Sequence, residues 1–396
     1  MNEKFEKLCR KRDSVVIFRS LGDDDVISDL MYLIGADQQN CEGFLGYYAD
    51  FVNALYENGI DLSEHILSAV LENDNLYVRK IATGQTPDRL VSECLMSELM
   101  FFQELSQLTP EDFTAELDYD GYLPRWKNSQ VDIAGSYMER LKLIGRYGYG
   151  KYAKHKIFIV RDGETVPVKY PDTQRLCDLY GYERERNQVI ANTKALLEGK
   201  PAQNVLLYGD AGTGKSSTVK AIVNEYADRG LRLIEITKEQ LKDIPCIIDE
   251  ISCNPLKFIL FIDDLSFASG EDCFGALKAM LEGSVSARAG NVAIYATSNR
   301  RHLVKECFSD RDGDDIHRND TIQEIISLSA RFGLTVNFSK PDKKSYVAIV
   351  SELAREKGIE MSEEELSVKA EAFALRGSGR SPRTAKQFVN QLYNEK

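Results

Sequence analysis

The sequence lacks any apolar run near the roughly 20 residues that a membrane-spanning helix requires. Its N-terminal segment, MNEKFEKLCRKRDS, is highly charged and has no apolar stretch of the kind found in a secretory signal. We therefore expect a cytoplasmic protein that makes no contact with a membrane.

Cysteine and histidine occur in none of the spacings that bind zinc. The eight cysteines are scattered without a C-x-x-C pair, and the four histidines are far apart. We interpret the cysteines as structural thiols in a reducing compartment. The acidic run DRDGDD at 310–315 could hold a metal ion, but a solvated loop accounts for it equally simply.

The charge balance argues against a protein coated by nucleic acid. The formal net charge is −12, from 62 acidic and 50 basic residues. Two short basic spots remain, KYAKHK at 151–156 and Arg300-Arg301. Each could contact nucleic acid locally or could be an ordinary solvated surface.

A glycine-rich segment carries the strongest functional signal. It fits the pattern G-x-x-x-x-G-K-[ST] and consists of Gly209, Asp210, Ala211, Gly212, Thr213, Gly214, Lys215 and Ser216. An apolar strand at 205–208 precedes it, and a helix is predicted from Ser217 to Asp228. Glycines let successive amides curl around phosphate oxygens at a helix N-terminus. We expect Lys215 to reach the β- and γ-phosphates and Ser216 to offer its hydroxyl to Mg²⁺.

A second apolar strand, at 258–262, ends in two carboxylates. Ligands bind at the carboxyl edge of a parallel sheet, so Asp263 and Asp264 are predicted to face the glycine loop. We expect Asp263 to hold Mg²⁺ through water together with Ser216, and Asp264 to orient or deprotonate the attacking water.

Three further polar residues follow predicted elements of the same region. The strand at 292–296 is followed by Thr-Ser-Asn299, and an amide there can bind the γ-phosphate or the water. Arg331 could neutralise charge on the transferred phosphoryl group. Arg383, just before the last helix, could bring a second guanidinium to the nucleotide.

The periodicities divide the chain into four parts. Residues 1–150 are predicted to be mainly helical, and 151–170 to form a β-hairpin or linker. Strands and helices alternate over 171–338, which predicts an α/β core with a parallel sheet flanked by helices. Residues 339–396 are predicted to form a small helical lid.

The order of these elements over 171–396 resembles the AAA+ ATPases, a branch of the P-loop NTPases. More narrowly, the segments IDDLSF, ALKAMLEG, YATSNRRHL and SLSARFG resemble a bacterial AAA+ family still carried under a domain-of-unknown-function label. The resemblance implies ATP and Mg²⁺ as cofactors.

The resemblance also implies roles for single residues. Tyr180 and Gly181 would lie in the linker against which adenine packs, and Asn299 would be the first sensor. Arg383 would be the second sensor on the lid, with Arg380 as the alternative. Arg331 would be an arginine finger that reaches the ATP of a neighbouring subunit, which implies a homo-oligomeric ring or spiral.

Two departures bear on the mechanism. Many AAA+ proteins have glutamate where this chain has Asp264, so hydrolysis could be slow. The segment 237–243 lacks the aromatic residue of an unfoldase pore loop, which makes threading of a polypeptide doubtful.

The function expected is ATP hydrolysis coupled to remodelling of an unknown protein or nucleic-acid target, chosen by the N-terminal region. One alternative is an ATP-gated switch with slow turnover. Another is a DNA-associated loader or remodeller. A kinase is disfavoured because the sequence shows no acceptor site.

Overall fold

The computed structural model describes residues 3–115, 117–265, 277, 281, 290–299, 331–377 and 379–395. The chain divides into two compact units. One comprises residues 1–154 with 253–255, and the other comprises 155–252 with 256–396.

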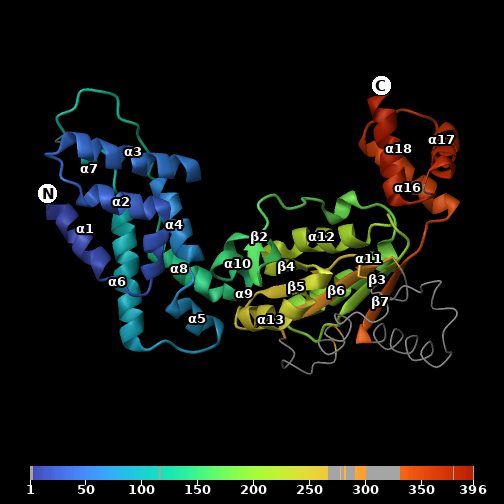
Figure 1. Ribbon diagram of the computed structural model, residues 1–396, viewed down its shortest axis with the longest axis horizontal. Coiled ribbons are helices and arrows are strands. Elements are labelled where there is room, and N and C mark those ends of the chain that lie inside the picture. The colour runs from blue at the N-terminus through green and yellow to red at the C-terminus, as the bar shows by residue number, and fades with distance from the viewer. Residues whose placement is uncertain are drawn as a thin grey trace. The chain divides into compact units, whose positions relative to one another are not determined.

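The first unit is helical, as the aromatic and aliphatic spacing predicts (Figure 1). Its helices are α1 (Glu3–Asp13), α2 (Asp25–Gly35), α3 (Cys41–Asn58), α4 (Leu62–Glu72), α5 (Leu76–Ala82), α6 (Arg89–Ser106), α7 (Pro110–Thr114), α8 (Ile133–Lys142), α9 (Ile144–Tyr147) and α10 (Lys151–Lys154). The 3-10 turn η1 spans Arg19–Asp23. On α3, Phe44, Tyr48 and Phe51 are buried in the core of this unit, whereas Tyr47 and Tyr56 are exposed.

The second unit is built on a seven-stranded sheet of order β2-β1-β4-β5-β6-β3-β7. The strands are β1 (Ile157–Arg161), β2 (Glu164–Pro167), β3 (Val205–Gly209), β4 (Leu231–Ile236), β5 (Lys257–Ile262), β6 (Val292–Ser298) and β7 (Leu334–Phe338). All neighbours pair in parallel except β1 and β2. The predicted α/β core with a parallel sheet is therefore confirmed.

Helices cover both faces of this sheet, which is why a central strand such as β5 carries apolar residues on both of its sides (Figure 1). One face packs against α11 (Glu183–Leu197) and α12 (Lys215–Tyr226) through alternate strand residues such as Leu207 and Phe261. The helix α13 (Ile244–Ser252) lies on the opposite face. Short 3-10 turns complete the connections: η2 (Leu176–Asp178), η3 (Ala227–Arg229) and η4 (Lys238–Asp243).

The predicted hairpin forms and belongs to the sheet itself. Strands β1 and β2 pair antiparallel around Asp162 and Gly163, whose φ angles of 50° and 80° suit a tight hairpin turn. Strand β2 is at the sheet edge, where Pro167 leaves no ladder hydrogen bond unmade. Because β1 also pairs with β4, the hairpin extends the sheet of the α/β core.

Three helices close the chain: α16 (Lys343–Glu356), α17 (Glu363–Arg376) and α18 (Pro382–Asn394). They share a small core that includes Tyr346, Val350 and Phe388. Ser381 caps α18 by accepting a hydrogen bond from the backbone N–H of Thr384, and Pro382 occupies the first turn. These two residues fix where α18 begins, and they thereby fix the position of Arg383 in its first turn.

Candidate functional site

The glycine loop lies at a topological switch point of the sheet. Strand β3 runs between β6 and β7, both of which come later in the chain. The connection after β3 leads to β4 on one side of it, whereas the connection after β6 leads to β7 on its other side, so a crevice opens between the carboxyl ends of β3 and β6. Helix α12 begins at this crevice with Lys215, earlier than the sequence predicts, because Gly214 with φ 92° serves as its N-cap.

Glycine is required at two loop positions by close backbone approach. A Cβ atom on Gly209, whose φ is 135°, would lie 2.3 Å from the carbonyl oxygen of Phe338. One on Gly212, with φ 78°, would lie 3.2 Å from both Arg383 Cβ and Ser381 Oγ. Glycine at 209 therefore lets the loop lie against β7, and glycine at 212 leaves room for Ser381 and Arg383 of the lid. The N–H of Arg383 also donates to the carbonyl of Gly212 at 3.2 Å.

Lys215 is buried, and its ammonium is satisfied within the loop. Its Nζ donates to the carbonyls of Gly209 at 3.0 Å and Asp210 at 2.8 Å, and to Asn299 Oδ1 at 3.1 Å. Burial lowers the pKa of Lys215 below its ordinary value, while the carboxylates of Asp210, Asp264 and Asp263 oppose that shift. A phosphate group entering here would stabilise the charged lysine.

The two acidic residues after β5 make different contacts, Asp263 with Ser216 of the glycine motif and Asp264 with Asn299. The Ser216 hydroxyl donates to Asp263 Oδ1 at 2.6 Å. Asn299 Nδ2 donates to Asp264 Oδ1 at 2.7 Å, so Asn299 joins Lys215 to Asp264. Asp264 has a φ of 51°, a left-handed conformation that costs free energy in a residue other than glycine. Such strain persists where surrounding hydrogen bonds hold it.

A cavity of about 900 Å³ opens beside these residues. The residues that line it include most of those predicted: Ala211, Gly212, Thr213, Gly214, Lys215, Ser216, Ser217, Asp263, Asp264, Asn299, Tyr180 and Arg383. Gly209, Asp210 and Gly181 are not among the described residues that line the cavity. The first two give carbonyls to Lys215, and a Cβ atom on Gly181, with φ 74°, would lie 2.8 Å from Ile349 Cδ1.

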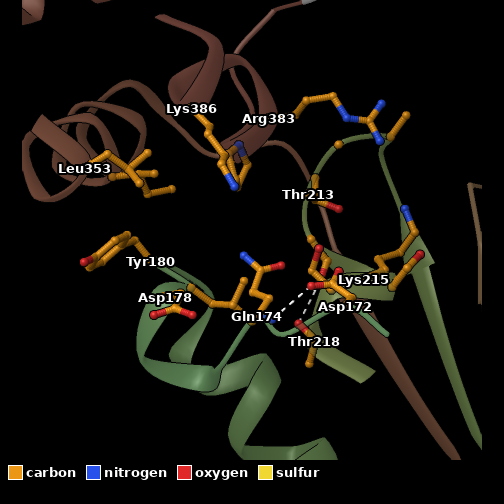
Figure 2. Close-up of a pocket in the computed structure, with 18 of the residues that line it drawn as sticks. Asp172, Gln174, Asp178, Tyr180, Thr213, Lys215, Thr218, Leu353, Arg383 and Lys386 are labelled. Atoms are coloured by element: carbon orange, nitrogen blue, oxygen red, sulfur yellow. Dashed lines mark hydrogen bonds between the residues drawn. The ribbon is translucent and has the colours of Figure 1, made fainter. Parts of the chain in front are cut away.

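The lid forms the far side of this cavity. Figure 2 shows Leu353, Arg383 and Lys386 facing the loop residues Thr213 and Lys215. Arg380, the alternative second sensor, instead donates two hydrogen bonds to Glu371, at 2.9 and 2.7 Å. Of the two arginines, the structure thus places Arg383, the residue preferred from the sequence, on the cavity wall and Arg380 in a pair with Glu371.

Sequence reasoning missed several residues of the wall. Lys386 follows Arg383 by one helical turn on α18 and lines the cavity with it. Gln174 comes from an irregular segment that Asn224 holds by hydrogen bonds to the carbonyls of Asp172 and Gln174. The helical spacing could have suggested Lys386, whereas the Gln174 segment has no periodic signal.

Other predicted residues lie away from the cavity or outside the described residues. Arg331 is partly buried just before β7 and is absent from the cavity lining known for the described part of the chain. Arg300, Arg301 and the acidic run 310–315 lie outside the described residues. The segment 237–243 contains η4, closed by reciprocal capping between Thr237 and Gln240.

The oxygen donors at the strand end fit Mg²⁺. This ion prefers oxygen ligands, keeps several waters and is commonly held by one or two side chains plus substrate phosphates. Ser216 and Asp263 offer such a pair on the cavity wall. Within the described ranges no cluster of three or more His, Cys, Asp or Glu could hold a metal.

No described helix is long and apolar enough to span a bilayer.

Similarity to known proteins covers part of the chain. The large subunit of replication factor C from Staphylothermus marinus is 31% identical over 122 residues, which are 29% of this chain and 28% of that protein. The chain thus spans less than a third of this relative. Among solved structures, DnaA of Aquifex aeolicus bound to AMPPCP has a TM-score of 0.40 at 18% identity, covering 57% of this chain and 66% of that one. The RuvB Holliday junction branch migration motor of Thermotoga maritima has a TM-score of 0.36 at 17% identity, covering 55% and 63%.

A family match decides the classification. The family described as "Protein of unknown function (DUF815)" matches residues 153–396, which include the whole sheet, the glycine loop and the lid. The prediction of a family that carries a domain-of-unknown-function label is confirmed. The chain belongs to the DUF815 family.

Proposed function

We propose that this chain is an ATP-binding, Mg²⁺-dependent AAA+ ATPase that couples hydrolysis to the remodelling of a macromolecular target. The observation that carries the proposal is one hydrogen-bonded set on the cavity wall, which joins Lys215 to Asp264 through Asn299 and Ser216 to Asp263. These are the groups needed to bind a triphosphate and to direct a water at it.

Each residue has a chemical task in this proposal. The loop amides and Lys215 bind the β- and γ-phosphates, and Arg383 approaches from the lid. Ser216 and Asp263 would hold Mg²⁺, which neutralises phosphate charge. Asp264 accepts the proton of the attacking water, and Asn299 orients that water or the γ-phosphate.

The hydrogen bonds also suggest how binding prepares the site. In the structure, Lys215 donates to Asn299, and Asn299 donates to Asp264. Phosphate oxygens are stronger acceptors for an ammonium than an amide oxygen is. When Lys215 turns to phosphate, Asn299 is released to meet the γ-phosphate, and the Asp264 carboxylate gains freedom to meet water.

An arginine supplied in trans is consistent with the position of Arg331. Arg331 precedes β7 and is not among the described residues that line the cavity of its own chain, so a contact of Arg331 with ATP would be made in a neighbouring subunit. We therefore propose a head-to-tail homo-oligomer, a ring or a spiral, in which ATP favours assembly. The helical N-terminal region would select the target.

Steady-state hydrolysis of ATP tests the proposal. Wild-type protein should release phosphate in a Mg²⁺-dependent manner, and Asp264→Asn should bind ATP but release phosphate at least tenfold more slowly. Asp178→Asn is a matched control, because Asp178 lines the same cavity on the η2 turn away from the strand end. Turnover well under one per minute with every target tried would favour the slow switch, and absence of ATP binding would refute both.

Nucleic acid is a second candidate target, favoured by a segregation of charge in the first unit. Residues 140–154 hold five cations and no acidic residue in a chain of net charge −12. Four of the five side chains are exposed: Lys142, Arg146, Lys151 and Lys154. Phosphate contacts of this kind give salt-dependent binding without sequence preference.

DNA stimulation of hydrolysis discriminates this candidate. Duplex or single-stranded DNA should raise turnover at low salt, and the effect should decline steeply as salt rises. Changing the four exposed cations to serine should abolish it. The control replaces four exposed cations of α1 in the same unit: Lys4, Lys7, Arg10 and Arg12. Equal loss in both variants, or stimulation insensitive to salt, would count against a nucleic-acid surface at 140–154.

A further inference from the structure

One buried hydroxyl connects the two acidic residues of the site. Thr297 Oγ1 donates to Asp263 Oδ1 at 2.5 Å and accepts the backbone N–H of Asp264 at 2.9 Å. The Thr297 side chain is only 2% exposed, so water does not compete for these bonds. A hydroxyl can donate and accept at once, which an aliphatic residue of the same shape cannot do.

The main chain of Thr297 holds the same segment from its other side. Its carbonyl accepts the N–H of Leu265 at 2.7 Å. Strands β5 and β6 pair Ile262 with Ala296, which brings the residues after Ile262 alongside Thr297. The left-handed turn at Asp264 is therefore fixed between a backbone bond and a side-chain bond, and only the second depends on the identity of residue 297.

The Asp263 carboxylate shows why this hydroxyl matters during turnover. Its Oδ1 accepts from Ser216 Oγ, Thr297 Oγ1 and the Asp264 N–H. In the proposed function the Ser216 hydroxyl oxygen would bind Mg²⁺, and its hydrogen bond to Asp263 would no longer fix the orientation of that carboxylate. Thr297 is outside that metal-binding pair, so its bond can keep the carboxylate oriented.

We propose that Thr297 is a positioning residue for the reaction. Its hydroxyl sets the direction of the Asp263 carboxylate and holds Asp264 in the strained conformation from which its side chain meets Asn299 and the attacking water. The inference rests on the proposed function. It gives Thr297 of β6 a positioning role that is separate from the role of Asn299, which follows the strand.

Two substitutions test the role. Thr297→Val keeps the side-chain shape and removes the hydroxyl, whereas Thr297→Ser keeps the hydroxyl. Valine should lower kcat about 10- to 100-fold, as displacement of a catalytic group by about an ångström does. ATP affinity measured in EDTA should stay within about threefold of wild type, while the gain in affinity on adding Mg²⁺ should shrink. Serine should restore kcat to within about threefold of wild type.

Hydrogen exchange supplies a readout that needs neither nucleotide nor metal. In Thr297→Val the Asp264 amide loses the shorter and more buried of its two hydrogen bonds and keeps only the longer one to Asp263 Oδ1, so its exchange should accelerate at least tenfold relative to wild type. Tyr295→Phe is the matched control: Tyr295 also lies on β6 and is buried, and its hydroxyl bonds Thr193 and Asn192, away from the acidic pair. This control should leave Asp264 exchange, kcat and the Mg²⁺ gain unchanged.

The outcomes separate the inference from the proposed function. Wild-type protein that binds no ATP would refute the proposed function and this inference with it. A wild type that hydrolyses ATP, beside a Thr297→Val protein with normal kcat, Mg²⁺ gain and amide exchange, would overturn the inference alone. Serine as impaired as valine would overturn it too. If Thr297→Val does not fold by thermal melting, Thr297→Ala carries the same comparison.

Discussion

Replacement of the loop lysine by an uncharged residue of similar length is the sharpest perturbation of the phosphate site. In Lys215→Met the side chain keeps its buried stem and loses the ammonium, which in the wild type donates to Gly209, Asp210 and Asn299. Without nucleotide the loss is partly offset, because burial already disfavours the charged lysine and lowers its pKa. We therefore expect only a small change in the unfolding temperature.

With ATP the balance changes. A hydrogen bond to a charged group contributes about 1.5–3 kcal/mol, and Lys215 would exchange neutral acceptors for phosphate oxygens. A net loss of about 2–4 kcal/mol corresponds to a Kd roughly 30- to 800-fold higher. Titration of a fluorescent ATP analogue into folded protein measures it.

A second lysine of the same helix is the matched control. Lys220 also belongs to α12, but it pairs with Glu235 at 3.2 Å instead of facing the cavity. Lys220→Met should leave ATP affinity within about twofold and cost less than about 1 kcal/mol of stability. The reasoning fails if Lys215→Met binds ATP within threefold of wild type, or if Lys220→Met weakens binding as much.

Four further outcomes are expected. Asn299→Ala should lower kcat tenfold or more with little change in ATP affinity, as single-turnover kinetics would show; a change confined to affinity would contradict this role. Arg383→Ala should reduce the preference for ATP over ADP, which competition binding measures. Arg380→Ala should leave that preference intact and lower the melting temperature of the lid, because it breaks the pair with Glu371. Thermal melts measure this second effect. Arg331→Ala should bind ATP normally and lose the dependence of specific activity on protein concentration, and unchanged activity would exclude a role in trans. Because the pKa of Lys215 is lowered from 10.5, ATP affinity should fall as pH rises through that lowered pKa, and ATP titrations at several pH values measure this. The free energy of unfolding of the nucleotide-free protein should instead rise between the lowered pKa and 10.5, because there the unfolded state binds more protons than the folded state. Thermal melts at several pH values measure this second trend.

Much of the fold could be predicted because its signals are local. The apolar run Phe258–Ile262 requires a strand buried on both faces, and the Asp-Gly pair at 162–163 requires a tight hairpin. The end of the strand predicted at 292–296 depends on a contact that is distant in the sequence. Thr297 and Ser298 are polar, which is typical of a loop, but they continue β6 because β3 pairs with them. Sheet partners override local polarity there.

The site divides in the same way. The loop and the Asp-Asp pair follow from residue spacing, because their chemistry is contained in a few consecutive residues. Contacts across the chain do not: the bond of Lys215 to Asn299 joins positions 84 residues apart, and the Arg380 pair with Glu371 depends on how α17 and α18 pack. Which arginine lines the cavity is thus a property of tertiary packing.

Isothermal titration of ATP with Mg²⁺ into folded wild-type protein tests the central claim most directly. The account predicts saturable heat with one site per chain, reduced strongly in Lys215→Met and kept in Lys220→Met. Absence of heat in wild-type protein whose fold is verified by circular dichroism, with ATP and with ADP, would contradict it.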